Sequence, residues 1–366
     1  MKKMKKSFSA GHLVLALACI VSFVVFILLT VIANSMVGNL DTQQMDKRWS
    51  NTGGVSQISC FFSVNATVTK DRIEEFEHAL DAALEEASIV SESTNTNARL
   101  WADAYSADGQ ISVESNLNKI TVDAIGIGGD FFLFHPMQLL SGSYFSGNDL
   151  MQDYCILDQD AAWKLFGSND VAGQVVYIGG VAHVVTGVVK QEEGKLYEAA
   201  GLDDSQIYVS YDTLENYGRN NGINHFEIVM PNPVSGYALE YVKKAIGVTE
   251  SELEVVENST RFDTLNRIKH IGKLSSRAMN GKAIIYPYWE NVARAYEDRV
   301  AVMMLFQLIF LVFPVIVISI VLVILWKRRT WTVKSVLLSL RDKIEDILSM
   351  RKSRRKRKEP QDDLTL

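Results

Sequence analysis

The side chains that could do chemistry are thinly scattered along this chain of 366 residues. Five of the six histidines are scattered singly along the sequence: His78, His135, His183, His225 and His270. A lone histidine is more often a core or surface residue than a metal ligand or a general base. The sequence also lacks a phosphate-binding loop of the Gly-x-x-x-x-Gly-Lys-Ser/Thr type. We therefore predict that the chain is not an enzyme and has no catalytic residue, cofactor site or metal site.

One acidic pair has a spacing that could hold a cation, namely Asp158 and Asp160. No second acidic pair accompanies it, and oxygen-ligated cations need more ligands than these two carboxylates supply. Acidic side chains are also stabilised by the positive end of a helix dipole. The pair therefore predicts a solvated helix N-terminus.

Two cysteines fall in the long middle segment, Cys60 and Cys155. If this segment lies outside the cytoplasm, a disulfide between them is allowed. Two buried thiols are the alternative, and spacing alone does not decide between them.

An aromatic cluster precedes the second apolar run of the chain and contains Tyr286, Tyr288 and Trp289. Tyrosine and tryptophan combine an apolar ring with a polar tip, which suits membrane interfaces and contact surfaces. These three residues are therefore candidate partner or membrane contacts. The alternative is that they cap a protein core.

Two apolar runs, residues 13–37 and 303–326, are long enough to cross a bilayer. We interpret both as transmembrane helices, with Pro314 as a candidate hinge in the second because proline kinks helices. A cleaved signal peptide is the alternative for the first run, but its apolar stretch is longer than the usual core of such a peptide.

Charge is distributed unevenly, although the net charge of the whole chain is only −6. Lysines precede the first run, Lys and Arg follow the second, and the segment between them is strongly acidic. Basic flanks stay in the cytoplasm, so we predict a multi-pass protein of the plasma or inner membrane with residues 1–12 and the C-terminal part inside. The acidic segment would lie outside and is unsuited to nucleic acid.

Beyond the second run, residues 330–349 place apolar side chains at steps of three and four. This pattern predicts an amphipathic helix on the inner membrane surface or against a partner protein. Leu337, Leu340 and Ile344 are its candidate contacts. The basic tail, residues 350–366, is expected to bind anionic lipid.

The segment between the two runs predicts an α+β domain. Residues 50–128 and 223–298 each show strand, helix and strand patterns, which we interpret as two halves of one layered domain. The expected elements are a strand over 53–69, a helix over 71–87, strands over 98–104 and 110–127, a long helix over 261–279 and a strand over 283–288. Residues 129–222 have short β-rich runs and glycine turns, typical of a small inserted subdomain.

The order of several short motifs within this segment resembles the MacB-like periplasmic core domain of type VII ABC transporter permeases. The motifs are Val-Asp-Ala-Ile-Gly at 122–126, Asp-Phe-Phe at 130–132, Leu-Leu-Ser-Gly-Ser-Tyr-Phe at 139–145, Cys-Ile-Leu-Asp at 155–158, Ala-Ala-Trp-Lys-Leu-Phe-Gly at 161–167, Val-Ala-Gly-Gln-Val-Val at 171–176 and Val-Val-Thr-Gly-Val-Val at 184–189. The resemblance is strongest over residues 122–189.

The resemblance implies a non-catalytic domain that transmits motion across the membrane or contacts substrate and partners. Such permeases have four spans, whereas this sequence shows two. We therefore expect a permease-like or accessory subunit that works with a cytoplasmic ABC ATPase and a second permease subunit. The alternative function is an extracytoplasmic sensor or signalling protein, since span, domain and span is also the outline of a receptor.

Overall fold

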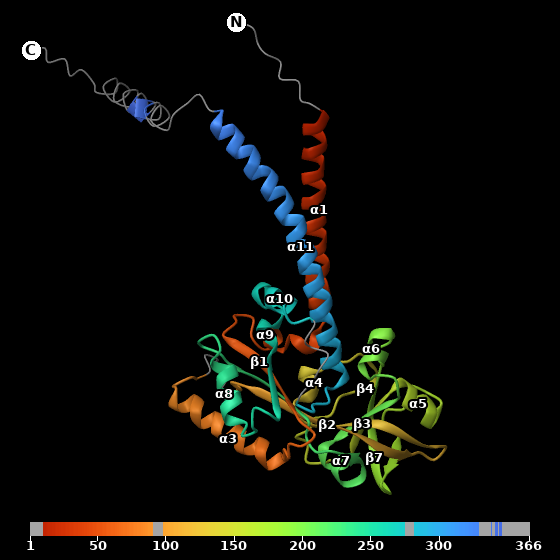
Figure 1. Ribbon diagram of the computed structural model, residues 1–366. Coiled ribbons are helices and arrows are strands. Elements are labelled where there is room, and N and C mark those ends of the chain that lie inside the picture. Colours follow the sequence, from red (N-terminus) through yellow and green to blue (C-terminus); the bar gives the residue numbers. More distant parts are fainter. Residues whose placement is uncertain are drawn as a thin grey trace, which may run out of the picture. The chain divides into compact units, whose positions relative to one another are not determined.

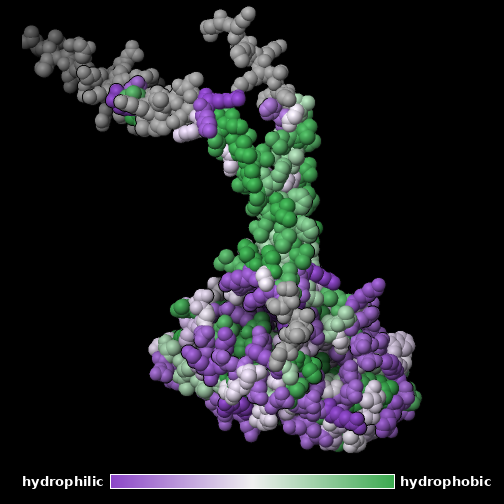
Figure 2. Space-filling model, viewed as in Figure 1, coloured by the Kyte–Doolittle hydropathy of each residue, from purple (hydrophilic) through white to green (hydrophobic). Residues whose placement is uncertain are grey.

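The computed structural model describes residues 10–90, 98–274 and 282–328, together with residues 338, 341, 342, 344 and 345. It divides into two units: Met1–Ile27 with Gln307–Leu366, and Leu28–Phe306. Two helices, α1 (Ala10–Gly38) and α11 (Tyr288–Lys327), are long and apolar enough to cross a membrane. Both expected apolar runs therefore lie in helices. Figure 2 shows hydrophobic side chains covering α1 and α11, while the second unit has a mostly hydrophilic surface.

The second unit is built on one mixed sheet, with β11 (Leu253–Glu257), β1 (Val55–Phe62), β10 (His225–Pro231), β2 (Ala102–Glu114), β3 (Lys119–Gly129), β8 (Gln206–Ser210), β5 (Tyr154–Asp158), β7 (Val181–Val189) and β4 (Leu139–Gly142) in that order. Two short strands, β6 (Val175–Ile178) and β9 (Arg219–Asn220), also pair with β2. The predicted α+β class is confirmed (Figure 1). We call this unit the sheet domain.

The two predicted strand-helix-strand halves interlock at one end of this sheet, where β11 is the edge strand. Strand β1 pairs antiparallel with both β10 and β11. Helices α3 (Lys70–Glu86) and α8 (Tyr237–Ala245) cover one face, where Phe76 of α3 lies 6.0 Å from Tyr241 of α8 between ring centroids. The buried positions of α3 fall at steps of three and four, which is the helical period that its sequence predicts.

A long hairpin of β2 and β3 continues the sheet from Ala104↔Gly129 to Glu114↔Lys119. The expected strands over 98–104 and 110–127 are therefore corrected: one strand runs through Asp108 and Gly109 without a break. The Cβ of any other residue at Gly109 would lie 2.3 Å from the carbonyl oxygen of Arg219, so glycine permits the approach of β9.

Strands from residues 129–222 extend the same sheet. Strand β8 pairs in parallel with β3 over Asp123↔Gln206 to Ile127↔Ser210, and β6 pairs with the far end of β2. This β-rich segment is therefore joined to the layered halves by backbone hydrogen bonds. Helices α4 (Phe131–Phe134), α5 (Gln159–Phe166), α6 (Lys195–Ala200) and α7 (Tyr211–Tyr217) complete it.

Helix α5 begins at the expected acidic position. Asp158 is its N-cap and accepts backbone N–H bonds from Ala161 and Gln206, both at 2.6 Å. The helix N-terminus is confirmed, but Asp158 is 2% exposed and is therefore not solvated.

Cys60 and Cys155 are buried free thiols.

Two expectations near the end of the sheet domain are wrong. In place of one helix over 261–279 there are two short ones, α9 (Asn258–Arg261) and α10 (Thr264–Ile271), and residues 275–279 lie outside the described residues. In place of a strand over 283–288 there is a single bridge between Ser63 and Ile284. The carbonyl of Pro287 accepts hydrogen bonds from the N–H groups of Glu290 and Asn291. Helix α11 therefore begins directly after Pro287, and it contains Tyr288 and Trp289.

Within the first unit, a polar contact joins α1 and α11. Pro314 lies inside α11 and has no N–H to donate to the carbonyl of Phe310, four residues earlier. The hydroxyl of Ser22 on α1 donates to this carbonyl at 2.8 Å. The neighbouring helix therefore satisfies the backbone group that proline leaves free, as apolar surroundings require.

Candidate functional site

The candidate site is the region of the sheet domain where the two long helices meet the sheet. The first connection is the segment after α1, which contains η1 (Asp41–Gln43) and α2 (Met45–Trp49). The buried side chain of Gln57 on β1 fixes this segment: its Nε2 donates to the carbonyl of Thr42 at 2.7 Å, and its Oε1 accepts from the N–H of Met45 at 2.8 Å. The segment that follows α1 is thus bonded to β1, the strand next to the edge strand β11.

The second connection is the base of α11, which is held by a buried ionic network. The guanidinium of Arg261 on α9 donates to both oxygens of Glu290, at 2.7 and 2.8 Å, and to Glu297 at 3.0 Å. It also donates to Gln43 of η1 at 2.9 Å. Glu290 and Glu297 lie seven residues apart, on one face of α11. We call Gln43, Arg261, Glu290 and Glu297 the joint network, because it bonds both connections to one side chain.

Burial makes this network energetically important. The side chains of Arg261 and Glu290 are 3% and 1% exposed. Burial alone would lower the pKa of Arg261, but the carboxylates of Glu290 and Glu297 raise it above its ordinary value, so the guanidinium stays charged. Bidentate pairing fixes direction as well as distance. The base of α11 is therefore tied rigidly to α9 and, through α9, to the sheet.

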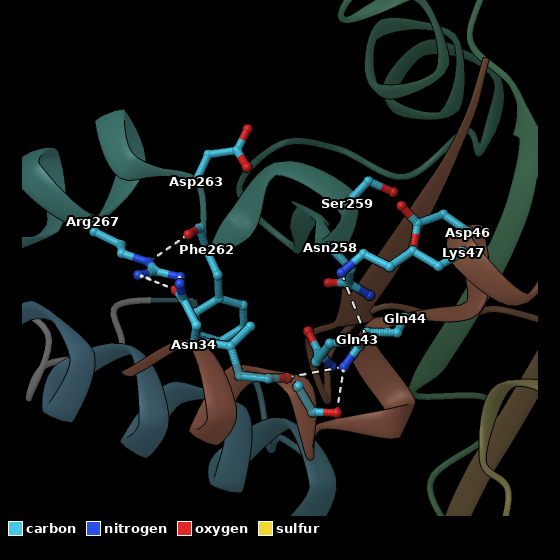
Figure 3. Close-up of a pocket in the computed structure, with 12 residues that line it drawn as sticks. Asn34, Gln43, Gln44, Asp46, Lys47, Asn258, Ser259, Phe262, Asp263 and Arg267 are labelled. Atoms are coloured by element: carbon cyan, nitrogen blue, oxygen red, sulfur yellow. Dashed lines mark hydrogen bonds between the residues drawn. The ribbon is translucent and has the colours of Figure 1, made fainter. Parts of the chain in front are cut away.

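A polar cavity of about 240 Å³ lies beside the joint network, between the end of α1, α2 and the α9–α10 corner. Figure 3 shows Arg267 of α10 pointing toward Asn34 of α1 and the backbone of Phe262. Both terminal nitrogens of Arg267 lie 3.2 Å from Asn34 Oδ1. Opposite them, the amide of Gln44 donates to the carbonyls of Val37 and Gly38, both at 3.0 Å. These bonds cap the C-terminal end of α1.

The predicted aromatic contacts lie at this same joint. Trp289 is 3% exposed and packs against His135, with 4.5 Å between ring centroids, so it belongs to the core. Tyr286 and Tyr288 are half-buried. The guanidinium of Arg294 lies 4.2 Å above the ring of Tyr286, a cation–π contact. In this structure the core interpretation therefore describes Trp289, and only the two tyrosines retain some accessible surface.

The other predicted contacts are partly outside the described residues. Leu337 and Leu340 are not described, and Ile344 is exposed. The amphipathic pattern of residues 330–349 and the basic tail therefore remain predictions. Pro314 lies within the continuous helix α11, and its role as a hinge also remains a prediction.

One cluster in the described structure was not predicted from the sequence. His135 and His225, which are far apart in the sequence, lie together with Glu227 in the core, and their ligand atoms are all within 4.8 Å of one another. The expectation of singly scattered histidines is wrong for these two. One signal was present, because His225 and Glu227 are two apart on a strand and so share a face. Nothing local indicated His135.

The chain thus contains a mixed α/β domain that lies in the sequence between two long apolar helices. Residues 13–246 match the family model of the MacB-like periplasmic core domain. This match covers more than half of the chain, and the chain therefore belongs to this family, whose domain occurs in ABC transporter permeases.

Three curated relatives match parts of the chain. Two are described as macrolide export ATP-binding/permease protein MacB. That of Chromobacterium violaceum is 31% identical over 130 residues, which are 35% of this chain and 19% of the relative. That of Pasteurella multocida is 32% identical over 90 residues, which are 23% of this chain and 14% of the relative. MacB 2 of Aeromonas hydrophila is 30% identical over 176 residues, which are 43% of this chain and 26% of the relative. The matched part is thus about a quarter or less of each relative.

Two solved structures are similar in fold. The periplasmic region of MacB from Actinobacillus actinomycetemcomitans aligns with 60% of this chain and 95% of its own, with a TM-score of 0.39 and 16% identity. The extracellular domain of the noncanonic ABC-type transporter YknZ from Gram-positive bacteria aligns with 55% of this chain and 99% of its own, with a TM-score of 0.36 and 17% identity.

Proposed function

We propose that this protein is a membrane subunit, permease-like or accessory, of an ABC-type transport or mechanotransmission assembly. A cytoplasmic ATPase would move the membrane helices, and the sheet domain would pass that motion to substrate or partner proteins outside the cytoplasm. The observation that carries the proposal is the joint network, because a bidentate buried ion pair at the base of α11 transmits a displacement of that helix to α9. The family of the chain agrees with this role.

The proposal places both ends of the chain in the cytoplasm and the sheet domain outside. Single cysteines introduced in residues 192–195 should react with an impermeant thiol reagent in intact cells. Cysteines in residues 351–358 should react only after permeabilisation. Labelling of the tail from outside would overturn this topology.

We further propose that residues 330–349 bind the ATPase or a second permease subunit through their apolar face, while the basic tail binds anionic lipid. The matched test uses Leu340→Asp and Ile344→Asp on the apolar face and Ser335→Asp on the polar face. After mild detergent extraction from native membranes, the first two variants should lose an ATP-binding partner that the wild type and Ser335→Asp retain. Equal recovery from all four proteins would refute the contact.

A further inference from the structure

The cluster of His135, Glu227 and His225 occupies the face of the sheet opposite α3 and α8. On β10, Phe226 and Ile228 point into the helix-covered core, so His225 and Glu227 point to the other face. His135 directly follows α4 and reaches the same place. All three side chains are at most 2% exposed. Three potential ligands are therefore held together away from solvent.

The geometry of the three groups is unusual for a set of hydrogen bonds. His135 Nε2 lies 2.9 Å from Glu227 Oε2, and His225 Nε2 lies 3.4 Å from Glu227 Oε1. Nevertheless, among the described residues, neither Nε2 atom nor Oε2 has a hydrogen-bond partner of acceptable geometry. Buried polar atoms without partners are rare and costly. The ligand atoms of the three residues lie within 4.8 Å of one another, so one cation could satisfy all of them.

We propose that His135, His225 and Glu227 bind one divalent transition-metal ion, with Zn²⁺ as the best fit. Two imidazoles and a carboxylate are a common ligand set for zinc. With bond lengths of about 2.0–2.1 Å, two ligand atoms of a tetrahedral ion lie about 3.3 Å apart. One ligand pair of the cluster, His135 Nε2 and Glu227 Oε2 at 2.9 Å, already has a separation near this value. Small side-chain movements would complete the site.

A second layer of contacts orients two of the proposed ligands. Ser59 donates to Glu227 Oε1 at 2.7 Å, and Asn258 donates to Ser59 at 2.6 Å, which leaves Oε2 for the ion. The hydroxyl of Ser106 lies 3.4 Å from His225 Nδ1, so the proton can reside on Nδ1 and the lone pair on Nε2. Such outer contacts fix the tautomer and direction of metal ligands.

A cavity of about 90 Å³ borders one of the proposed ligands. His135 lines it together with Tyr288, Trp289 and the segment after α1. Within the described part of the chain, the buried indole N–H of Trp289 has no hydrogen-bond partner, so it could donate to a water on the ion. Because Trp289 belongs to the first turn of α11, the ion would stiffen the packing of this helix on β10.

The test uses the full-length chain in detergent, stripped of metal with a chelator and titrated with Zn²⁺ against a chromophoric competitor. The wild type should bind one ion per chain, and Co²⁺ should give the visible absorption of a tetrahedral nitrogen–oxygen site. His225→Gln and Glu227→Gln should weaken binding by more than about 100-fold. His183→Gln is the matched control, because His183 is a buried histidine bonded to Thr213 outside the cluster.

Zn²⁺ should also raise the unfolding temperature of the wild type and of His183→Gln, and leave that of His225→Gln unchanged. The proposal fails if the wild type binds less than one tenth of an ion per chain, or if His225→Gln binds as tightly as the wild type. The Co²⁺ spectrum needs no substitution, so a variant that does not fold leaves the test intact. A negative result would leave the cluster as a buried polar contact between the two histidines and Glu227, and would leave the proposed transport role unaffected.

Discussion

Replacing Arg261 with methionine is the perturbation whose effect is most closely defined by the structure. Methionine fills much of the same volume but leaves the carboxylates of Glu290 and Glu297 without their cation. Glu290 is 1% exposed and cannot recover its hydration. Breaking a buried pair by removing one partner costs about 3–5 kcal/mol.

The size of the domain converts this loss into a change of unfolding temperature. For a domain of this size, each kcal/mol shifts the unfolding temperature by about 2–4 °C. We therefore expect Arg261→Met to unfold about 6–20 °C below the wild type.

The assay is thermal unfolding of the full-length protein in detergent, followed by tryptophan fluorescence, since Trp289 lies in the core beside the joint. Arg267→Met is the matched control: Arg267 bonds Asn34 at an exposed site, and exposed polar or ionic contacts contribute about 0–1 kcal/mol. The double variant Arg261→Met with Glu290→Gln should recover part of the loss, because it leaves a single carboxylate without its cation. A loss below about 1 kcal/mol for Arg261→Met, or no recovery in the double variant, would refute the reasoning.

Three further substitutions test other parts of the structure. Asp158→Ala should destabilise the sheet domain by about 2–4 kcal/mol in denaturant unfolding, because it frees two buried N–H groups, whereas Asp158→Asn should cost less. Burial and the neighbouring Glu77 raise the pKa of Asp103. The stability that its protonated form contributes is therefore complete below about pH 4 and is lost as the pH rises through the raised pKa. Asp103→Asn should unfold at a higher temperature than the wild type at pH 8, and the difference should be smaller at pH 5. Ser22→Ala should weaken α1–α11 association by about 0.5–2 kcal/mol in the wild type but not in Pro314→Ala, where the new N–H bonds Phe310; equal losses in both backgrounds would contradict the assigned contact.

The sequence predicted those elements whose signal lies within a few neighbouring residues. The apolar spacing of α3, the two apolar helices and the helix start at Asp158 all follow from positions a few residues apart. The ordered motifs over residues 122–189 predicted the family, which the match over residues 13–246 confirms.

Contacts between distant segments escaped prediction for a physical reason. Pairing of β3 with β8 and of Arg261 with Glu290 depends on the folded sheet, and no local sequence signal accompanies either contact. The strand expected over 283–288 was favoured by its aromatic and branched residues. Pro287 instead directly precedes α11, since its fixed φ suits a helix start and tertiary packing of Trp289 outweighs strand propensity.

The measurement that tests the central claim most directly is site-specific photo-cross-linking in native membranes from position Leu340. A benzophenone amino acid at this position should form a cross-link to an ATP-binding protein upon irradiation, and the same group at Ser335, on the opposite face of the predicted helix, should not. Identification of an ABC ATPase in the Leu340 product would support a subunit that is driven from the cytoplasm. Cross-links only to lipid, or to a signalling protein that does not bind ATP, would contradict the account.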